Sequence, residues 1–396
     1  MGQLVSFLGT RFTEVAIPFQ VFQLTHSTFA LGLIGLVQLL PVLAFAFLGG
    51  ALADARDRRA MVLLTELVFT LTSVLLLANA LLPHPILPLL YVIGAVQAGL
   101  FALQRPSLEA MTPRLVPTQE LTAAGALSQV RGGVAMVAGP ALAGGVLALA
   151  GLPAAYAVDV ASFGFSLVAL ALMRAMPPAL EAERPSLRRV REGLAHAWSR
   201  PELLGTYLID MIAMFFGFPA ALFPAVAALF GGPAVLGLLF SAPAVGGLLA
   251  SATSGWTSRV RRHGWGVILA AIAWGVAITA FGLASALPVA LVCLALAGAA
   301  DSISGIFRGA IWNQTIPDRL RGRLASIELL SYTTGPLLGD FEAGTVASLF
   351  SIRVSIVSGG ILCVAGCALC ALLLPAFRAY DARARETKGM DSGGRE

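Results

Sequence analysis

The sequence predicts an all-α polytopic membrane protein in which twelve transmembrane helices form two six-helix bundles. Composition is the first reason: 58% of the 396 residues are hydrophobic and 12% are charged, whereas about a quarter of a soluble domain is charged. The second is spacing, because apolar runs of roughly 20 residues, the length that crosses a bilayer, follow one another with short turns between them. The third is the distribution of arginine, which falls on alternate turns.

The predicted spans are separated by turns rich in glycine and proline, such as Ala150-Gly151-Leu152-Pro153 and Phe230-Gly231-Gly232-Pro233. Glycine and proline inside the runs do not argue against helices, since neighbouring helices satisfy the freed backbone groups. The twelve spans are expected at about residues 3–24, 29–53, 61–82, 87–110, 122–150, 154–174, 203–228, 234–254, 265–285, 288–311, 324–349 and 354–375.

The basic residues predict the orientation. Of the 26 Lys and Arg residues, 22 lie in one alternate set of loops and in the tail, Arg353 lies in the opposite turns, and Arg11, Arg131 and Arg308 lie inside spans. Cytoplasmic loops carry the excess of basic residues, so both termini are expected on the cytoplasmic side. Met1 stands almost at the start of the first span, which leads us to expect that the native chain begins upstream.

A long loop divides the chain. It carries Leu187, Val190, Leu194 and Trp198 at helical spacing between charges, which predicts an amphipathic helix on the membrane surface. The expected domains are therefore an N-terminal bundle (1–174), a linker (175–202), a C-terminal bundle (203–376) and a cytoplasmic tail (377–396). The halves are weakly similar, because Gly139-Pro140 recurs as Gly335-Pro336, as expected for two parallel repeats.

Charges inside a membrane are functional candidates because they are costly to bury. Arg11 and Glu14, three residues apart, can be a structural ion pair or part of a site. A structural role is the favoured interpretation for Asp159, near the predicted outer end of its span. Arg308 is either a functional charge inside its span or a flank of the cytoplasmic surface. Asp210 and Asp301 lack a basic residue one turn away and are interpreted as lone carboxylates that can load and release a proton.

These considerations give two sets of candidates. The proton-coupling candidates are Glu14, Asp210 and Asp301. The candidates for the substrate cavity are Arg11, Gln20, Gln97, Gln104 and Tyr207, with Trp312 among further polar groups of the spans.

Several function classes find no support in the sequence. The four histidines lie in loops or in the surface helix on both sides of the membrane, so no metal site is expected, and the four cysteines read as packing inside helices. No phosphate-binding loop is seen. The net charge of +5 comes from arginines in short loops and does not indicate nucleic acid binding. We therefore expect no cofactor and no enzyme activity, and a monomer whose partners are the bilayer, a small-molecule substrate and protons.

Two motifs resemble a known family. The turn after the second span holds Gly50, Asp54, Arg58 and Arg59 in an order similar to the signature of the major facilitator superfamily, although Ala55 and Asp57 depart from it. The stretch Gly139-Pro140-Ala141-Leu142-Ala143-Gly144-Gly145 resembles the antiporter motif of that superfamily, with Ala143 in place of one glycine. Within the superfamily the whole chain resembles bacterial exporters of the enterobactin-exporter and macrolide-efflux group, through stretches such as Ala16-Ile17-Pro18-Phe19-Gln20 and Leu222-Phe223-Pro224-Ala225.

The resemblance implies a mechanism and a location. It implies proton-coupled export of an amphipathic small molecule, a drug or a siderophore-like compound, by alternating access across the bacterial cytoplasmic membrane. It also implies that spans one, four, seven and ten line the cavity. An importer of a nutrient or a lipid flippase on the same fold stays open as an alternative.

The same resemblance suggests a cytoplasmic gate made of Gly50, Asp54, Arg58, Arg59 and Arg105. We expect Asp54 to accept hydrogen bonds from the start of the eleventh span, near Leu324–Ser326, where the helix dipole favours a carboxylate. Arg58 and Arg105 would hold Asp54 there.

Overall fold

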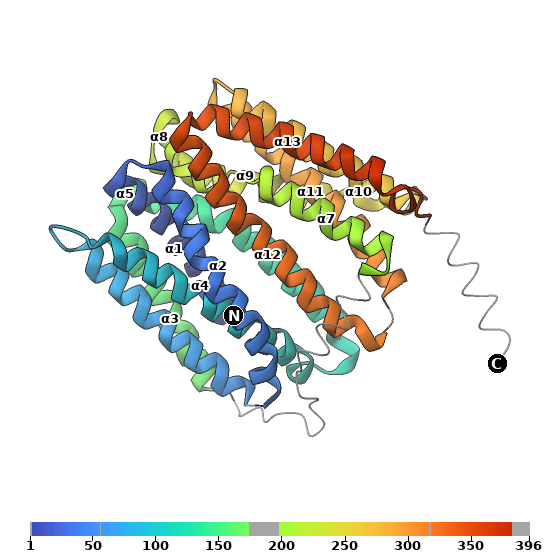
Figure 1. Ribbon diagram of the computed structural model, residues 1–396. Coiled ribbons are helices and arrows are strands. Elements are labelled where there is room, and N and C mark those ends of the chain that lie inside the picture. The colour runs from blue at the N-terminus through green and yellow to red at the C-terminus, as the bar shows by residue number, and fades with distance from the viewer. Residues whose placement is uncertain (1, 56, 174–197, 317, 382–396) are drawn as a thin grey trace. The chain divides into compact units, whose positions relative to one another are not determined.

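The computed structural model describes residues 2–55, 57–173, 198–316 and 318–381, and the regular structure in these ranges is helical throughout (Figure 1). Nine stretches of the described chain are long and apolar enough to cross a membrane. The predicted all-α membrane fold is thereby confirmed. The predicted amphipathic helix and the end of the tail lie outside the described residues, apart from the exposed Trp198.

The count of twelve spans stays a prediction. One of the nine stretches, α5 (Leu121–Ala171), has 51 residues and contains two helices, because Gly151 adopts φ 77° and ψ −177° two residues before Pro153. Glycine adopts positive φ without steric cost, so the predicted turn forms there. The helices α1 (Gly2–Thr25) and α12 (Asp318–Leu349) are long but do not count among the nine.

The chain forms two compact units. The first comprises Met1–Pro185 and Ala220–Ser241. In it α1 packs along α5, α2 along α4, and α3 lies against both α4 and α5. Besides α1 and α5, its helices are α2 (Thr28–Ala55), α3 (Arg58–Ala80), α4 (Leu87–Leu115), η1 (Thr118–Glu120), η2 (Ala220–Leu222), α8 (Phe223–Phe230) and the first part of α9 (Pro233–Ala252).

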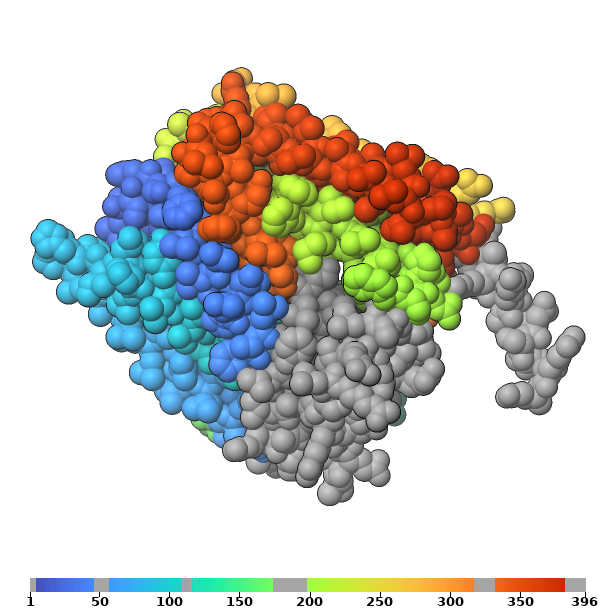
Figure 2. All heavy atoms as spheres, viewed as in Figure 1, coloured from blue at the N-terminus to red at the C-terminus, as the bar shows by residue number. Residues whose placement is uncertain are grey.

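The second unit comprises Ser186–Pro219 and Ala242–Glu396. In it α10 packs against α11 and α13, and α7 packs against α12 and α13. Figure 2 shows one face of this unit, on which α7 (green) lies between α12 (orange) and α13 (red). Its helices are α7 (Pro201–Phe216), the remainder of α9, η3 (Ser254–Arg259), α10 (His263–Leu283), α11 (Leu287–Thr315), α12, α13 (Ile352–Leu373) and α14 (Pro375–Arg378).

The predicted seventh span, 203–228, is not one helix. Helix α7 ends at Phe216, and Gly217 follows as its C-cap. A side chain at Gly217 would meet the indole nitrogen of Trp274 at 2.5 Å, so only glycine fits this close approach. Pro219 has no N–H to continue the helix. The chain resumes in η2 and α8, which belong to the first unit. The helix is therefore interrupted inside this span, although Pro201–Phe230 as a whole is one of the nine stretches that are long and apolar enough to cross a membrane. The division of the chain at residues 174 and 203 stays a prediction.

Candidate functional site

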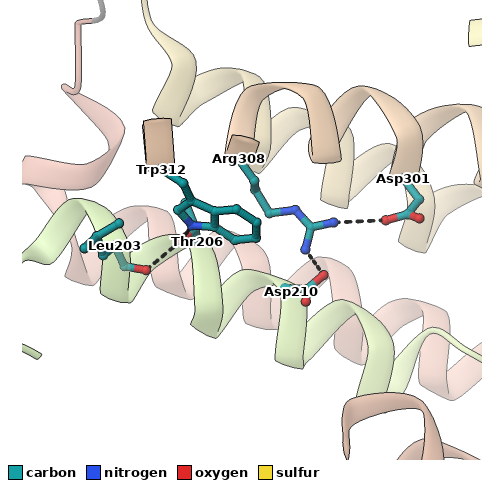
Figure 3. Close-up of polar contacts among 6 residues, drawn as sticks. All are labelled: Leu203, Thr206, Asp210, Asp301, Arg308 and Trp312. Carbon is teal, nitrogen blue, oxygen red and sulfur yellow. Dashed lines mark hydrogen bonds and ion pairs between the residues drawn. The ribbon is translucent and has the colours of Figure 1, made fainter. Parts of the chain in front are cut away.

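Two acidic residues share one arginine in the second unit. Arg308 of α11 forms an ion pair with Asp210 of α7, and its second terminal nitrogen lies 3.3 Å from Oδ1 of Asp301, also on α11 (Figure 3). The Asp210 and Arg308 side chains are only 7% and 11% exposed, whereas that of Asp301 is 43% exposed. These three residues, which we call the charge triad, carry a net charge of −1 when all are ionised.

The interpretation of Asp210 and Asp301 as lone carboxylates was wrong, because both are paired with Arg308. Arg308 follows Asp301 by seven residues, which is two helical turns on one face, and the long arginine side chain covers that distance. Asp210 comes from another helix, and its pairing depends on which face of α7 packs against α11. The spacing within one helix could not show this contact.

Aromatic side chains adjoin the charge triad. Trp312, one turn after Arg308, stacks on Tyr207 of α7 with ring centroids 5.8 Å apart and an interplanar angle of 24°. The indole N–H of Trp312 donates to Oγ1 of Thr206 at 2.9 Å, and Thr206 donates to the carbonyl of Leu203 at 2.7 Å. This chain of hydrogen bonds, drawn in Figure 3, fixes the Trp312 ring beside the charged groups. The predicted cavity residue Tyr207 thus lies in the same cluster as two predicted proton sites.

The third proton candidate, Glu14, lies in the first unit and is paired with Arg11 at 2.5 Å. Glu14 is 48% exposed, while Arg11 is 12% exposed and also lies over the ring of Phe7, 4.6 Å from its centroid. The aliphatic part of Arg11 packs against Gly139, where an added Cβ would come within 2.6 Å. The pair therefore joins α1 to the glycine-rich motif of α5.

The three predicted glutamines are engaged inside the first unit. Gln97 donates to Thr72 at 3.1 Å, Gln104 donates to Glu66 at 3.3 Å, and Gln20 accepts from the Tyr156 hydroxyl at 2.7 Å. Gln20 and Gln104 are buried. Each contact uses one polar atom of the glutamine, and the buried Nε2 of Gln20 has no hydrogen-bond partner within the described chain. The role of the three glutamines as substrate ligands stays a prediction.

A row of buried polar contacts runs along α1, and the sequence interpretation gave it no role. We call it the polar seam. Its members on α1 recur every seven residues, so they share one face. The contacts are Ser6 with Glu66, Thr13 with Asp159, Ser73 with Asp159, and Gln20 with Tyr156. The seven-residue repeat of Ser6, Thr13 and Gln20 was the sequence signal that could have revealed the seam.

The glycines of the predicted antiporter motif have distinct surroundings. A Cβ on Gly144 would lie 2.7 Å from the backbone of Gly237 in α9, and Ser241 of α9 donates to the carbonyl of Val137 at 2.7 Å. Gly145 faces open space, with nothing near its Cβ position. Within the first unit, Gly144 is thus a point of backbone contact between α5 and α9. Pro140 is buried in the same stretch.

The turn before α3 has local roles that the family pattern does not show. Asp57 is the N-cap of α3, with its carboxylate accepting from the N–H of Ala60 at 2.8 Å. Arg59 donates to the carbonyls of Leu170 and Ala171 at 2.9 and 2.8 Å and so caps the end of α5. The departure at Asp57 from the signature is therefore a helix cap.

The structure describes only some of the remaining residues of the predicted gate. The side chains at 50 and 54, like those at 324–326, lie outside the described residues, so the predicted contact of Asp54 is not described. Arg58 and Arg105 are half-buried.

Helices of membrane-spanning length with buried charged and polar contacts between them are features of membrane transporters, and the family match places this chain in the major facilitator superfamily. Over residues 1–391 the chain matches the family described as "Transmembrane secretion effector", and it belongs to that family. Among curated relatives, the enterobactin exporter EntS of Citrobacter koseri is 27% identical over 375 residues, which cover 94% of this chain and 90% of that protein. The EntS of Escherichia coli O1:K1 is 26% identical over 361 residues, covering 91% and 87%.

Solved structures agree on the fold. A bacterial homologue of the iron transporter ferroportin, in an inward-facing state, superimposes with a TM-score of 0.69 at 18% identity, covering 96% of this chain and 97% of that one. A POT family transporter in complex with 5-aminolevulinic acid gives a TM-score of 0.74 at 12% identity, covering 94% and 95%. The family match and the curated relatives, in addition to this fold, identify the chain as a transporter.

Proposed function

We propose that this protein exports an amphipathic small molecule, a drug or a siderophore-like compound, in exchange for protons by alternating access. Support for the substrate class comes from relatives named as enterobactin exporters, which match over nine-tenths of this chain. The observation that carries the proton coupling is the charge triad, in which one arginine is shared by two carboxylates.

The sharing of Arg308 gives proton binding a mechanical effect. When both carboxylates are ionised, Arg308 bridges α7 and α11 through Asp210 and is also held by Asp301. A proton on Asp210 removes the attraction that links the two helices, and Arg308 then pairs with Asp301 on its own helix. A proton on Asp301, which is more exposed, leaves the bridge in place. Protonation of Asp210 is therefore the step proposed to loosen α7 from α11.

The aromatic pair offers a surface for the apolar part of a substrate. The Trp312–Tyr207 stack lies one turn from Arg308, so an amphipathic molecule could rest on the rings and place a polar group at the triad. Aromatic faces also attract cations. The negative net charge of the triad makes it a better place for a proton or a cationic group than for an anion.

Transport into inverted membrane vesicles tests the coupling. Uptake of the substrate found by a susceptibility screen should collapse with an uncoupler, and Asp210→Asn and Asp301→Asn should each lose the sensitivity to the uncoupler. Glu120→Gln, at an exposed carboxylate of η1, is the matched control and should behave as the wild type. Normal uncoupler-sensitive transport in both aspartate variants would overturn the assignment of the triad, and Glu14→Gln would then be examined for the same loss.

The direction of transport needs a separate measurement. A deletion strain should accumulate more of the substrate than the parent strain if the protein exports. Lower accumulation would indicate an importer, and unchanged accumulation together with altered lipid asymmetry would indicate a flippase.

We also propose a location in the bacterial cytoplasmic membrane with both termini on the cytoplasmic side. The support is the concentration of arginine in alternate loops. A reporter that is active only in the cytoplasm, fused after Glu396, should be active, and the same reporter inserted beside Arg353 should be inactive.

The gate around Asp54 belongs to the same proposal. Asp54→Asn should favour the state that is open to the cytoplasm, while Asp57→Asn should not, because an asparagine side chain can still cap α3. Equal accessibility of cavity cysteines from the cytoplasm in wild type and Asp54→Asn would refute the gate.

A further inference from the structure

Asp159 occupies an unusual position in the first unit. It lies on the second helix of α5, is 0% exposed, and faces α1 and α3. Two hydroxyl groups donate to its Oδ2 atom, Thr13 of α1 and Ser73 of α3, each at 2.6 Å. Its Oδ1 atom has no hydrogen-bond partner within the described chain.

The surroundings of Asp159 do not suit a charged carboxylate. Among the described residues, no arginine, lysine or histidine forms an ion pair with it. Buried carboxylates that stay ionised are paired with a cation or receive hydrogen bonds on their remaining lone pairs. Here both donors are neutral and both serve the same oxygen, so half of the carboxyl group is left without stabilisation.

Helix α1 closes over the unpartnered oxygen. A Cβ added to Gly9 would lie 2.9 Å from Oδ1 of Asp159 and 2.7 Å from the Cβ of Ser162, so the α1 backbone rests directly on this part of α5. Gly9 stands between Ser6 and Thr13, the two seam residues that contact carboxyl groups. The close approach of α1 is therefore what keeps Asp159 out of solvent.

We infer that Asp159 is a proton-binding site of the first unit, which holds its proton while α1 is closed over it and releases it when α1 separates from α3 and α5. On release the O–H bond of the carboxylic acid breaks, the proton passes to the entering water, and the electron pair stays on the carboxylate. Thr13 and Ser73 are positioned to stabilise that charge. The inference rests on the proposed proton coupling, to which it adds a second site, but its test does not depend on transport.

Other titratable groups face Asp159 from the packed helices. They are Glu14 on α1, Glu66 on α3 and Tyr156 on α5. Arg11 neutralises Glu14, and Glu66 receives hydrogen bonds on both of its oxygens. Tyr156 donates to Gln20. Asp159 thus differs from Glu14, which is paired with a cation, and from Glu66, which receives hydrogen bonds on both oxygens.

Infrared spectroscopy of the full chain in lipid vesicles tests the protonation directly. The wild type at neutral pH should show the carbonyl-stretch band of a protonated carboxylic acid, and Asp159→Asn should lose one such band. Glu66→Gln and Asp210→Asn are matched controls in which the band of Asp159 should persist. The double variant Thr13→Val/Ser73→Ala keeps Asp159, and its band should shift because both hydrogen bonds are lost. Identical spectra for the wild type, Asp159→Asn and the double variant would overturn the inference, as would loss of the band on adding sodium at constant pH.

Spin-label distances test the link to α1. Labels at His26 and Leu81, exposed residues just after α1 and α3, report the separation of these helices in a background from which the native cysteines 293, 363, 367 and 370 are removed. In alkaline solution a second, longer distance should appear, with a population that grows by up to about tenfold per unit of pH until Asp159 is mostly deprotonated. Asp159→Asn should abolish this response, and an unchanged response in that variant would contradict the inference.

The two proposals can fail independently. If Asp210→Asn and Asp301→Asn keep uncoupler-sensitive transport while the Asp159 band and the spin-label response are present, the triad assignment fails and the Asp159 site stands. If the triad variants lose coupling but Asp159→Asn changes neither spectrum nor distances, the proton site in the first unit fails.

Discussion

Asp159 in the first unit and Asp210 in the second are both buried carboxylates on helices of a membrane protein, yet they meet opposite kinds of partner. Asp210 is paired with a guanidinium, which also serves Asp301. Asp159 receives two hydroxyl groups and no cation among the described residues. Asp210 is compensated by a fixed positive charge, whereas Asp159 is the carboxylate for which we infer compensation by a mobile proton. The comparison teaches that a carboxylate at membrane depth must be judged by its partners and not by its depth.

The largest expected effect comes from removing the fixed charge. Arg308→Ala leaves Asp210 and Asp301 close together without a cation, and breaking a buried ion pair in this way costs about 3–5 kcal/mol. Thermal unfolding of the purified protein in detergent measures the loss. It should be larger in alkaline than in acid solution, because protonation relieves the unpaired charge. Adding Asp210→Asn should restore part of the stability, and the absence of any such rescue would argue against the triad.

A smaller effect is expected where the first unit depends on close packing. Gly144→Ala would place a Cβ 2.7 Å from the backbone of Gly237, and overpacking of this kind costs about 1–3 kcal/mol. Gly145→Ala is the matched control, since nothing lies near its Cβ position. The control should be neutral or slightly stabilising, because alanine favours a helix by about 1 kcal/mol over glycine. Equal unfolding temperatures for the two variants would contradict the described contact.

Loss of one hydroxyl donor to Asp159 should destabilise the protein by less than the overpacking at Gly144. Ser73→Ala removes one of the two hydrogen bonds to Asp159, which corresponds to about 0.5–1.5 kcal/mol if Asp159 is neutral. A loss well above this range, measured by thermal unfolding at neutral pH, would mean that Asp159 is charged. Ser258→Ala, at an exposed hydroxyl of η3, is the control for a serine without a buried partner.

The smallest effect on stability is expected for Asp159→Asn. Asparagine has the shape of a protonated aspartate and can still accept from Thr13 and Ser73, so unfolding should shift by less than about 1 kcal/mol. The corresponding Asp210→Asn should cost more, since it removes an ion pair with Arg308. If the two variants lose equal stability, the contrast between the units does not hold.

Part of this arrangement followed from the sequence. Apolar runs of membrane length predicted the helices, and the Gly151-Leu152-Pro153 turn was predicted because glycine and proline meet there between two such runs. The break after Phe216 was not predicted, because isolated glycine and proline are common inside spans and only the neighbouring Trp274 makes Gly217 necessary. Local patterns therefore defined where helices begin and end better than where they are interrupted.

The candidate site was predicted less completely. Asp210, Asp301 and Tyr207 were chosen for their residue type, and they lie together because α7 packs against α11. The pairing of Arg308 was missed, since its partner Asp210 lies on another helix and one sequence does not define which faces of α7 and α11 meet. Asp159 stands eight residues after the Gly151 turn, about 12 Å along the helix, so its depth could have been inferred from helical rise alone.

The contact between Gly144 and Gly237 limits which amino-acid substitutions helix α5 can accept. Exposed apolar positions of α5 such as Leu142 and Leu149, which are 54% and 91% exposed, should exchange among apolar residues at little cost, because in a membrane lipid tails are as apolar as leucine. At Gly144 and Gly237 a hydrogen atom takes the place of a side chain, and only glycine is small enough for the two backbones to approach so closely. A saturation library of α5 should therefore tolerate many substitutions along its exposed face and almost none at Gly144. The sequence of this helix is thus constrained at Gly144 and free to vary along its exposed face.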